Sequence, residues 1–507
     1  MKTWVKSLLR SKTFWFCLAF LVVNTFVIFE LFLRHGFSGG KKLSALVVFA
    51  LELLLLGAYF LARKKSWPLE KLFLLVVVPL GLLFLTLMPL GQSPDEYTHA
   101  MRIYGITDGY LLVPQTEDNS GGSPIPTDFD NLFHIFIGSG TYSELLGHLS
   151  DSDTSELSDH NYVTAALYNP ICYLPQTLGV GLGRLLSLPF AFQFYLGRLF
   201  NFILWAALIY FSLKFMPKYK SLMLFATLLP ITLQEATSLA PDALTIGLVF
   251  FLIAFVLHLA YAKTTALNTR DYLILYALAI LLGFCKIVYL PLLLLYFLIP
   301  AERFGDKRRK HRHAIIIFIL VAAVNLAWLL FCSRYLVDVR DGVSPSDQLS
   351  FILHRPFRYL IILAQTCWAR FDFYMTSLLG TSLAHFEIIL PQVYFYLIFA
   401  FFILVIFQNT DHFKFRPFDR IILVASVVLV FVLIHTSLYL QWTPVAAATV
   451  EGVQGRYFLP FLPLVPVLFN SNRPKPLRPS WLSHELILLF GIFVNVCALS
   501  CIFFANV

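Results

Sequence analysis

The chain has 507 residues, of which 58% are hydrophobic and only 13% are charged, and its mean hydropathy is +0.75. Because a soluble domain usually carries about a quarter charged residues, this composition excludes an ordinary soluble protein and indicates an integral membrane protein. The net charge of +9 does not indicate nucleic-acid binding, since the basic residues form short clusters between apolar runs.

Apolar runs long enough to cross a bilayer as helices recur along the whole chain. We expect an uncleaved first span at 13–33, followed by spans at 43–62, 71–91, 192–215, 221–239, 242–262, 314–333, 391–408, 420–441, 457–470 and 484–505. Two shorter runs within 272–300 flank Cys285 and Lys286, and they predict a broken or re-entrant hairpin with Lys286 near its tip. The sequence thus predicts an all-α polytopic membrane protein with about 13 membrane segments.

Clusters of Lys and Arg predict the orientation of these segments, because such residues concentrate in cytoplasmic connections. If the N-terminus is cytoplasmic, one side receives the clusters at 2–12, 63–65, 214–220, 307–312, 414–420 and 473–478. The exceptions, on the outer side, are Arg34, Lys41 and Lys42.

Two large outer regions result from this topology. Residues 92–170 hold twelve acidic residues and a single Lys or Arg, and residues 334–390 contain an amphipathic, aromatic stretch that predicts interfacial helices. We divide the chain into two N-terminal spans (1–70), a membrane core (71–470) and a cytoplasmic basic linker with the final span (471–507).

The stretch LGQSPDEYTHAMRIYG, residues 90–105, places charged groups directly after a predicted span. Ser93-Pro94-Asp95-Glu96 has the form of a capping box, with Ser at the N-cap, Pro at the first helical position and Glu at the third. On a helix that starts there, Asp95, His99 and Arg102 share one polar face. A helix cap needs neither His99 nor Arg102, so we expect a functional site.

Four further candidates lie where later segments meet the outer face. Asp242 follows a proline and opens an apolar helix, and Lys286 is a lysine at membrane depth, where charged side chains usually have partners. In GVQGRYFLP, Gln454 and Arg456 lie beside glycines that allow the backbone to approach a ligand. A dipole-favoured acid and a snorkelling arginine are the structural alternatives.

Carboxylates beside cations at one membrane face suit group transfer from a phosphate-linked lipid. Such a reaction needs one general base for the acceptor hydroxyl, and it needs cations that screen the leaving phosphate. We expect Asp95 to be the base, with Glu96 and His99 assisting it or holding a divalent cation (Mg²⁺ or Mn²⁺), and Arg102, Arg456 and Lys286 to hold the phosphate.

Several motifs in order along the chain carry a family resemblance: PDEYTH, YLPQTLG at 173–179, GRLFN at 197–201, SLAPDAL at 238–244, CKIVYLPL at 285–292 and QGRYFLPFLP at 454–463. They resemble the bacterial membrane family known as domain of unknown function 2142, over about residues 70–470. That family is similar to GT-C glycosyltransferases. The resemblance implies a GT-C-like core with a large first outer loop and a polyprenyl-phosphate-sugar donor. It also implies an acidic catalytic residue that maps onto Asp95. We expect Tyr173 and Gln176 to form part of the site wall.

We therefore expect a transferase in a bacterial plasma membrane, with its site facing outside, that adds a sugar to a cell-surface glycan such as a rhamnan or teichoic acid. A polysaccharide polymerase, a lipid-linked glycan flippase and a non-catalytic assembly partner remain alternatives. A transporter is less consistent with the sequence, because the chain shows no internal repeat and its charges gather on one face.

Overall fold

A computed structural model describes residues 12–36, 39–115, 121–135, 140–151, 156–333, 340, 342–407, 415–468 and 483–507. Within these residues, eight helices are long and apolar enough to cross a membrane, so the chain is an all-α polytopic membrane protein. They are α2 (Lys12–His35), α3 (Gly39–Lys64), α4 (Leu69–Leu87), α10 (Phe190–Phe215), α13 (Asp242–Leu257) continued by the π-helical turn η2 (His258–Ala262), α15 (Lys307–Cys332), α20 (Pro417–Gln441) and α22 (His484–Ala505).

Other predicted membrane segments are shorter or broken. The expected span 221–239 is two helices, α11 (Lys220–Thr227) and α12 (Pro230–Ala236), because Pro230 has no backbone N–H and starts a new helix. The expected span 457–470 is the 3-10 helix η6 (Gly455–Leu464) followed by α21 (Val465–Leu468), and α19 (Gln392–Phe407) is a single apolar helix of 16 residues. The total of about 13 segments stays a prediction.

The hairpin expected at 272–300 is broken at the predicted place. Helix α14 (Thr269–Phe284) ends beside Cys285, and the 3-10 helix η3 (Ile287–Leu298) begins directly after Lys286. A further 3-10 turn, η4 (Ala301–Phe304), leads into α15. Lys286 therefore lies in the interruption between two apolar helices.

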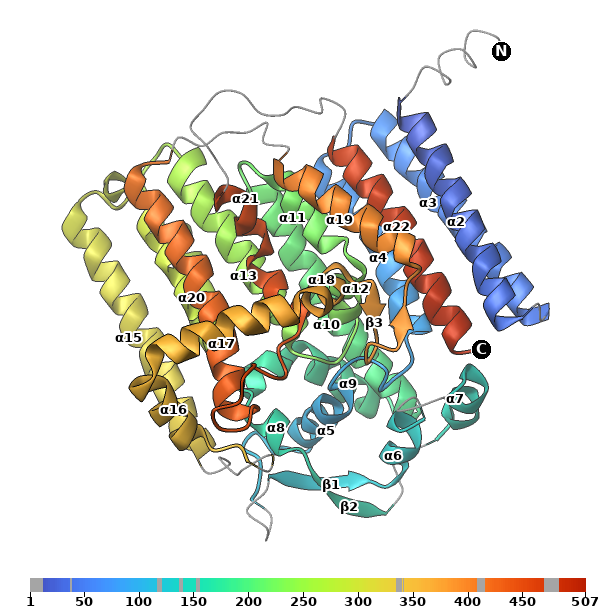
Figure 1. The fold of residues 1–507 in the computed structure, drawn as a ribbon, viewed down its shortest axis with the longest axis horizontal. Helices are drawn as coiled ribbons and strands as arrows, with labels where there is room; N and C mark the ends of the chain where they lie inside the picture. Colours follow the sequence, from blue (N-terminus) through green and yellow to red (C-terminus); the bar gives the residue numbers. More distant parts are fainter. Residues whose placement is uncertain are drawn as a thin grey trace.

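The described residues between 96 and 185 form a compact unit at one end of the bundle, which we call the cap (Figure 1). Strand β1 (Gly122–Pro126) pairs antiparallel with β2 (Leu157–Asn161), and Ser123 is opposite His160. The cap has its own core, in which Phe129 stacks on Phe133 with ring centroids 4.5 Å apart. Its helices are α5 (Glu96–Thr107), α6 (Asp128–Phe133), α7 (Tyr142–His148), α8 (Val163–Ala166), the 3-10 turn η1 (Pro170–Tyr173) and α9 (Leu174–Leu185).

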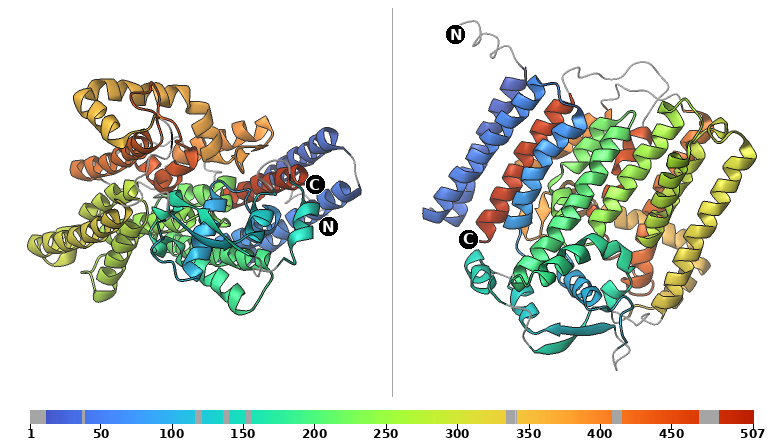
Figure 2. Two further views of the ribbon diagram at one scale, coloured as in Figure 1. Left: turned by 90° about the horizontal axis from the view of Figure 1, so that it is seen from below. Right: turned by 180° about the vertical axis from the view of Figure 1, so that it is seen from behind.

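A second non-spanning unit follows α15. Helices α16 (Pro345–His354) and α17 (Pro356–Ala369), which we call the arm, lie on one side of the bundle, and α17 runs across the spans rather than along them (Figures 1 and 2). The arm continues into α18 (Phe371–Leu379) and into the paired strands β3 (Ser382–Leu383) and β4 (Ile388–Ile389). This orientation agrees with the interfacial helices expected in 334–390, of which residues 334–339 and 341 lie outside the described residues.

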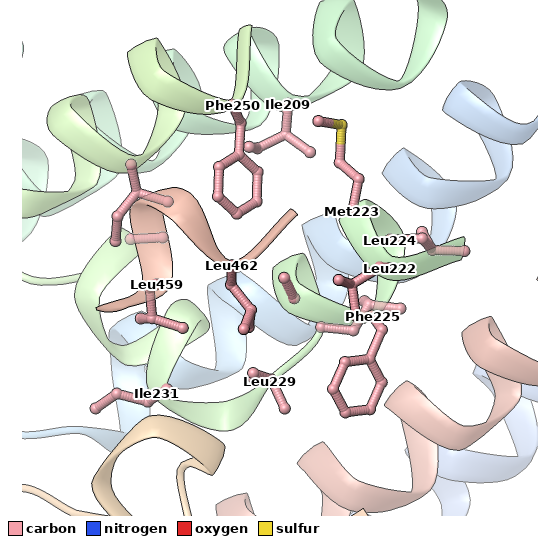
Figure 3. Packing of buried hydrophobic residues seen from close by; sticks show 14 of the residues in the cluster. Ile209, Leu222, Met223, Leu224, Phe225, Leu229, Ile231, Phe250, Leu459 and Leu462 are labelled. Carbon is pink, nitrogen blue, oxygen red and sulfur yellow. The ribbon is translucent and has the colours of Figure 1, made fainter. Parts of the chain in front are cut away.

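The main core lies where α10, α11, α12, α13 and η6 meet (Figure 3). Ile209 of α10 and Phe250 of α13 approach Leu462 of η6, and Phe225 of α11 lies next to Leu229. Because η6 has prolines at 460 and 463 it cannot form a regular α-helix, yet its side chains are almost fully buried. This burial fixes the chain on the C-terminal side of Arg456.

The connections with basic clusters at 63–65, 214–220 and 307–312 lie at the end of the bundle opposite the cap (Figure 1). This arrangement agrees with the predicted charge asymmetry, although the clusters at 2–10 and 473–478 lie outside the described residues. The two N-terminal helices pack beside α22, and Asn24 Nδ2 of α2 donates to Glu52 Oε1 of α3 at 3.0 Å and to the carbonyl of Phe493 at 3.3 Å.

Candidate functional site

Asp95 lies in a tight turn between α4 and α5. Gly91 has φ +84°, and a Cβ there would lie 2.4 Å from the carbonyl oxygen of Phe133, so the close approach requires glycine. Asp95 itself has φ 62°, a left-handed conformation that costs about 1 kcal/mol for most residues and less for Asp. Its side chain is 59% exposed. The turn therefore presents the Asp95 carboxylate outward instead of folding it onto the helix.

The predicted capping box is wrong. Helix α5 begins at Glu96 rather than at Pro94, and Asp95 is its N-cap without a side-chain capping bond. In the described structure the Ser93 hydroxyl has no hydrogen-bond partner. The local pattern is overridden because Glu96 has a stronger partner from a distant helix.

That partner is Arg198 of α10. Its Nε donates to Glu96 Oε1 at 2.7 Å, and both side chains are fully buried. The Glu96 carboxylate also accepts the backbone N–H groups of Gly91 and Leu239, each at 3.0 Å, while Arg198 donates to the carbonyl of Pro89 at 2.8 Å. Glu96 therefore ties the turn to α10 and to the loop before α13, and these contacts occupy its oxygens. This arrangement supports a structural role for Glu96 rather than the predicted catalytic one.

Arg456 reaches Asp95 from the other end of the chain. Its Nη2 donates to Asp95 Oδ2 at 2.7 Å, and its Nη1 donates to Glu235 Oε1 of α12 at 3.1 Å. The Arg456 side chain is only 4% exposed, so it is buried between one exposed and one buried carboxylate. The two charges predicted to share a site are thus in direct contact across 361 positions, although their chemical roles stay predictions.

Close packing before Arg456 sets its position. The Gly455 N–H donates to Ser377 Oγ of α18 at 2.9 Å. A Cβ on Gly455 would lie 2.1 Å from the carbonyl oxygen of Tyr374, so only glycine allows η6 to lie this close to α18. The glycine therefore serves helix packing at this point, which brings the following arginine into the site.

A second ion pair lies beside the first. Lys286 Nζ donates to Asp242 Oδ1 at 2.6 Å, which joins the tip of the broken hairpin to the first turn of α13. The Tyr457 ring connects the two pairs, since its centroid is 5.1 Å from Lys286 Nζ and 5.5 Å from the guanidinium carbon of Arg456. Such cation–π contacts hold both cations against one ring. The two pairs therefore belong to one charged cluster.

His99 forms the cap-side wall of the cluster. Its Nδ1 is 2.8 Å from the hydroxyl of Tyr173, and the Tyr168 ring packs against it edge-on with centroids 5.5 Å apart. Tyr168 also lies 5.6 Å from Lys286 Nζ. His99 and Tyr173 are thus buried together next to the ion pairs, and the His99 backbone N–H donates to the backbone carbonyl of Asp95 at 3.2 Å.

Burial and neighbouring charges shift the protonation of these groups. Although the Asp95 side chain is partly exposed, the protein around its carboxyl removes some of its hydration, which raises the pKa; Arg456, His99 and Lys286 outweigh this effect and hold the pKa below its usual value. Burial lowers the pKa of His99 to about 4, against the opposing effect of Asp95 and Asp242. At neutral pH we therefore expect a charged Asp95 and a neutral His99.

Other predicted site residues have structural partners. Arg102 donates to the carbonyls of Tyr110 and Leu111, both at 2.8 Å, so its guanidinium holds the turn that ends α5. Gln176 donates to the carbonyls of Leu239 and Ala240, at 3.3 and 3.2 Å, and so supports the turn that precedes Asp242. These contacts show that both side chains support the local backbone, and their predicted contacts with a ligand stay predictions.

Several buried polar atoms in and around the cluster have no protein partner within the described residues. They are Oε2 of Glu235, Nε of Arg456, and Oε1 of both Gln454 and Gln176. Since buried polar groups are nearly always hydrogen-bonded, such atoms mark places for water or ligand hydroxyls. Gln454, two residues before Arg456, is therefore still a candidate for ligand contact.

Sequence reasoning missed three contributors: Glu235, Arg198 and Tyr457. Glu235 and Arg198 each lie inside a stretch that was assigned as an apolar span, at 221–239 and 192–215. An isolated charge within a predicted span is itself a signal, because such charges face partners or functional cavities. Applying that rule to every span would have found both.

The predicted divalent-cation site lacks a preformed ligand set in the described residues. No group of three or more His, Cys, Asp or Glu side chains lies close enough there to hold a metal ion. Glu96, one of the predicted ligands, is paired with Arg198, which leaves Asp95 as the accessible carboxylate. Mg²⁺ is commonly held by one or two carboxylates together with substrate phosphates, so Asp95 fits that mode of binding.

Comparison with known proteins gives one match. No curated protein and no solved structure matches the chain. A family model described as "Predicted membrane protein (DUF2142)" matches residues 78–465, a range that runs from α4 through η6 and includes every residue of the charged cluster. Helices α2, α3 and α22 lie outside the matched range. The chain belongs to this family of predicted membrane proteins, DUF2142.

Proposed function

We propose that this chain is a membrane glycosyltransferase that moves a sugar from a polyprenyl-phosphate-linked donor to an extracytoplasmic cell-surface glycan. The contact between Asp95 and Arg456 carries the proposal: an exposed carboxylate touches a buried guanidinium at 2.7 Å. Transfer from a sugar phosphate needs a base for the incoming hydroxyl and a cation for the departing phosphate. The pair offers these two groups side by side.

The proposed step is an inverting displacement. The acceptor hydroxyl oxygen forms a bond to the anomeric carbon while the bond from that carbon to the phosphate oxygen breaks. The electron pair of the broken bond leaves on the phosphate, where Arg456 and Lys286 neutralise its charge. The hydroxyl proton passes to Asp95. No proton need be supplied to the leaving group, because a phosphate is a stable anion when cations screen it.

Donor binding would also tune the base. Without a donor, Arg456 helps to hold the pKa of Asp95 below its usual value, which makes Asp95 a weak base. A donor phosphate competes for the same guanidinium and adds negative charge, and both changes raise the pKa of Asp95. The acid limb of the pH profile should therefore lie at higher pH for kcat than for kcat/KM.

The local geometry argues against a purely structural role for Asp95. An acid that only stabilised α5 would cap the helix or interact with its first-turn N–H groups, whereas the Asp95 carboxylate bonds to Arg456. An exposed carboxylate in a left-handed turn is a form of local strain typical of functional sites. A polymerase would use the same chemistry, so the product must distinguish it from a transferase.

The test replaces the chromosomal copy with variants and measures the sugar composition of the wall polysaccharide by mass spectrometry. Asp95→Asn should lower decoration by about 10²-fold or more at normal protein level. Arg456→Lys should keep part of the activity, and Arg456→Ala should keep almost none, because Lys retains the charge but not the bidentate fork.

The matched control is Glu451→Gln, which removes the carboxylate of an exposed ion pair with Arg340 that is separate from the cluster. It should leave decoration unchanged. Unchanged decoration in Asp95→Asn would refute the assignment. Shorter polysaccharides of unchanged sugar composition would indicate a polymerase. Accumulation of the lipid-linked donor in the inner leaflet would indicate a flippase.

A further inference from the structure

A hollow of about 540 Å³ lies at the elbow of the arm, and its lining includes no residue of the charged cluster. Its wall comes from the end of α16, the start of α17 and one residue of the loop after α20. The lining residues are Phe351, His354, Arg355, Pro356, Phe357, Arg358 and Ala446. The hollow therefore combines aromatic surface with basic side chains, and no acidic residue lines it within the described chain.

The two arginines are available for a ligand. Arg355 separates α16 from α17, and Arg358 lies in the first turn of α17; both are exposed. Neither takes part in an ion pair within the described residues, and Arg355 lies over the Phe351 ring at 5.9 Å. His354 is held separately, since its Nδ1 is 2.8 Å from the carbonyl of Ser350. The hollow thus has two unpaired positive charges.

Hydrogen bonds hold the wall in place. The Ala446 N–H donates to Gln348 Oε1 of α16 at 2.8 Å, and the Tyr439 hydroxyl of α20 donates to the carbonyl of Ala447 at 2.9 Å. The Tyr359 hydroxyl of α17 lies 2.7 Å from Thr436 Oγ1. Loop, arm and bundle are therefore linked, so the site is formed before a ligand arrives.

The exposed face of the arm, which begins at the hollow and continues along α17, carries large apolar side chains. Phe357 is 81% exposed and Trp368 is 88% exposed, and Leu353 and Leu360 are also exposed. Helix α17 runs across the spanning helices (Figure 1). In a bilayer it would therefore lie parallel to the membrane surface, as interfacial helices do. Aromatic and aliphatic side chains at such a surface contact acyl chains, while arginines reach lipid phosphates.

We propose that the hollow binds the phosphate headgroup of an anionic phospholipid of the surrounding bilayer. Arg355 and Arg358 hold the phosphate as charge-assisted donors, and the exposed aromatic side chains cover the acyl chains. A free phosphate would leave this apolar rim uncovered, whereas a lipid satisfies the charges and the rim together. The site is independent of the proposed transfer reaction, so its test measures binding rather than activity.

The experiment is native mass spectrometry of the purified full chain in detergent, titrated with phosphatidylglycerol or with phosphatidylcholine. The unaltered chain should bind its first phosphatidylglycerol more tightly than phosphatidylcholine. The double variant Arg355→Gln/Arg358→Gln should bind phosphatidylglycerol about tenfold or more weakly, because two charge-assisted contacts are lost. The matched control, Arg370→Gln, removes an exposed arginine that does not line the hollow, and it should bind as the unaltered chain does.

Unaltered thermal unfolding of the double variant would show that the loss is local. Equal binding of phosphatidylglycerol by the double variant and the unaltered chain would overturn the proposal, as would an equal loss in Arg370→Gln. Displacement of the lipid by millimolar glycerol phosphate would also overturn it, because the site would then recognise a soluble phosphate. If the double variant fails to fold, Arg358→Gln alone should still show a measurable part of the loss.

Discussion

The contact between Glu96 and Arg198 offers the sharpest test of how the candidate site is built. Glu96→Gln keeps the side-chain shape but removes the charge, so Arg198 becomes an uncompensated buried cation. The amide also places an NH₂ group where the carboxylate now accepts a backbone N–H, from either Gly91 or Leu239. Breaking a buried pair typically costs 3–5 kcal/mol, and we expect a loss of about that size.

Thermal or denaturant unfolding of the purified chain measures this loss. The single variants Glu96→Met and Arg198→Met, together with Glu96→Met/Arg198→Met, form a double-mutant cycle. The double variant should lose roughly 2 kcal/mol less free energy of unfolding than the two single variants together, because two apolar side chains leave no isolated charge. If Glu96→Gln unfolds like the unaltered chain yet lacks transferase activity, Glu96 takes part in the chemistry, and its structural role is refuted.

Three further predictions concern stability. The pKa of His99 falls from 6.5 to about 4 on folding, so the unfolded chain binds a proton between these pH values that the folded chain does not. The free energy of unfolding should therefore fall by roughly 3 kcal/mol between pH 6.5 and pH 4, and thermal unfolding of His99→Gln should show a smaller decline. Gly455→Ala should destabilise by about 3 kcal/mol or more, since its Cβ meets the carbonyl oxygen of Tyr374, and wild-type stability would refute that packing. Glu52→Leu should lower the free energy of unfolding by about 1–3 kcal/mol, because Asn24 would lose a buried hydrogen-bond acceptor. Glu52→Gln keeps an acceptor oxygen and should cost less. Equal effects of the two substitutions would show that this hydrogen bond does not stabilise the fold.

The helical framework could be predicted because apolar run length is a property of the local sequence. Runs of about 20 residues became spanning helices at α10, α13 and α20, and two short runs around Lys286 became a broken hairpin. The break within 221–239 also has a local cause, since Pro230 interrupts the apolar run and starts a new helix.

The details of the site could not be predicted from local patterns. Ser93 to Glu96 match a capping box, but the pattern does not reveal that Arg198, 102 positions away, takes the glutamate. Long-range ion pairs of this kind depend on which helices become neighbours. The closeness of Asp95 and Arg456 was easier to predict. Asp95 follows one predicted span and Arg456 directly precedes another, and both positions lie at the same membrane face.

The charge balance of the cluster leads to a last prediction. Asp95, Glu235 and Asp242 carry three negative charges when ionised, against the two positive charges of Arg456 and Lys286. When all three are ionised, an anionic donor enters a site that already has one excess negative charge, which costs free energy in a partly buried environment. Binding must therefore bring in a compensating positive charge, either a proton on a carboxyl group or a divalent cation.

Titration calorimetry with a short-chain polyprenyl phosphate distinguishes these two routes. Proton uptake makes the binding heat depend on the ionisation enthalpy of the buffer and weakens binding as the pH rises; a cation makes binding sensitive to EDTA. Asp95→Asn removes the excess negative charge, so it should bind the lipid phosphate more tightly than the unaltered chain while failing to transfer sugar. Two results together would show that the phosphate does not enter this cluster. Asp95→Asn would weaken donor binding, and binding by the unaltered chain would depend on neither pH nor EDTA. The cation for the phosphate would then have to be sought elsewhere on the outer face.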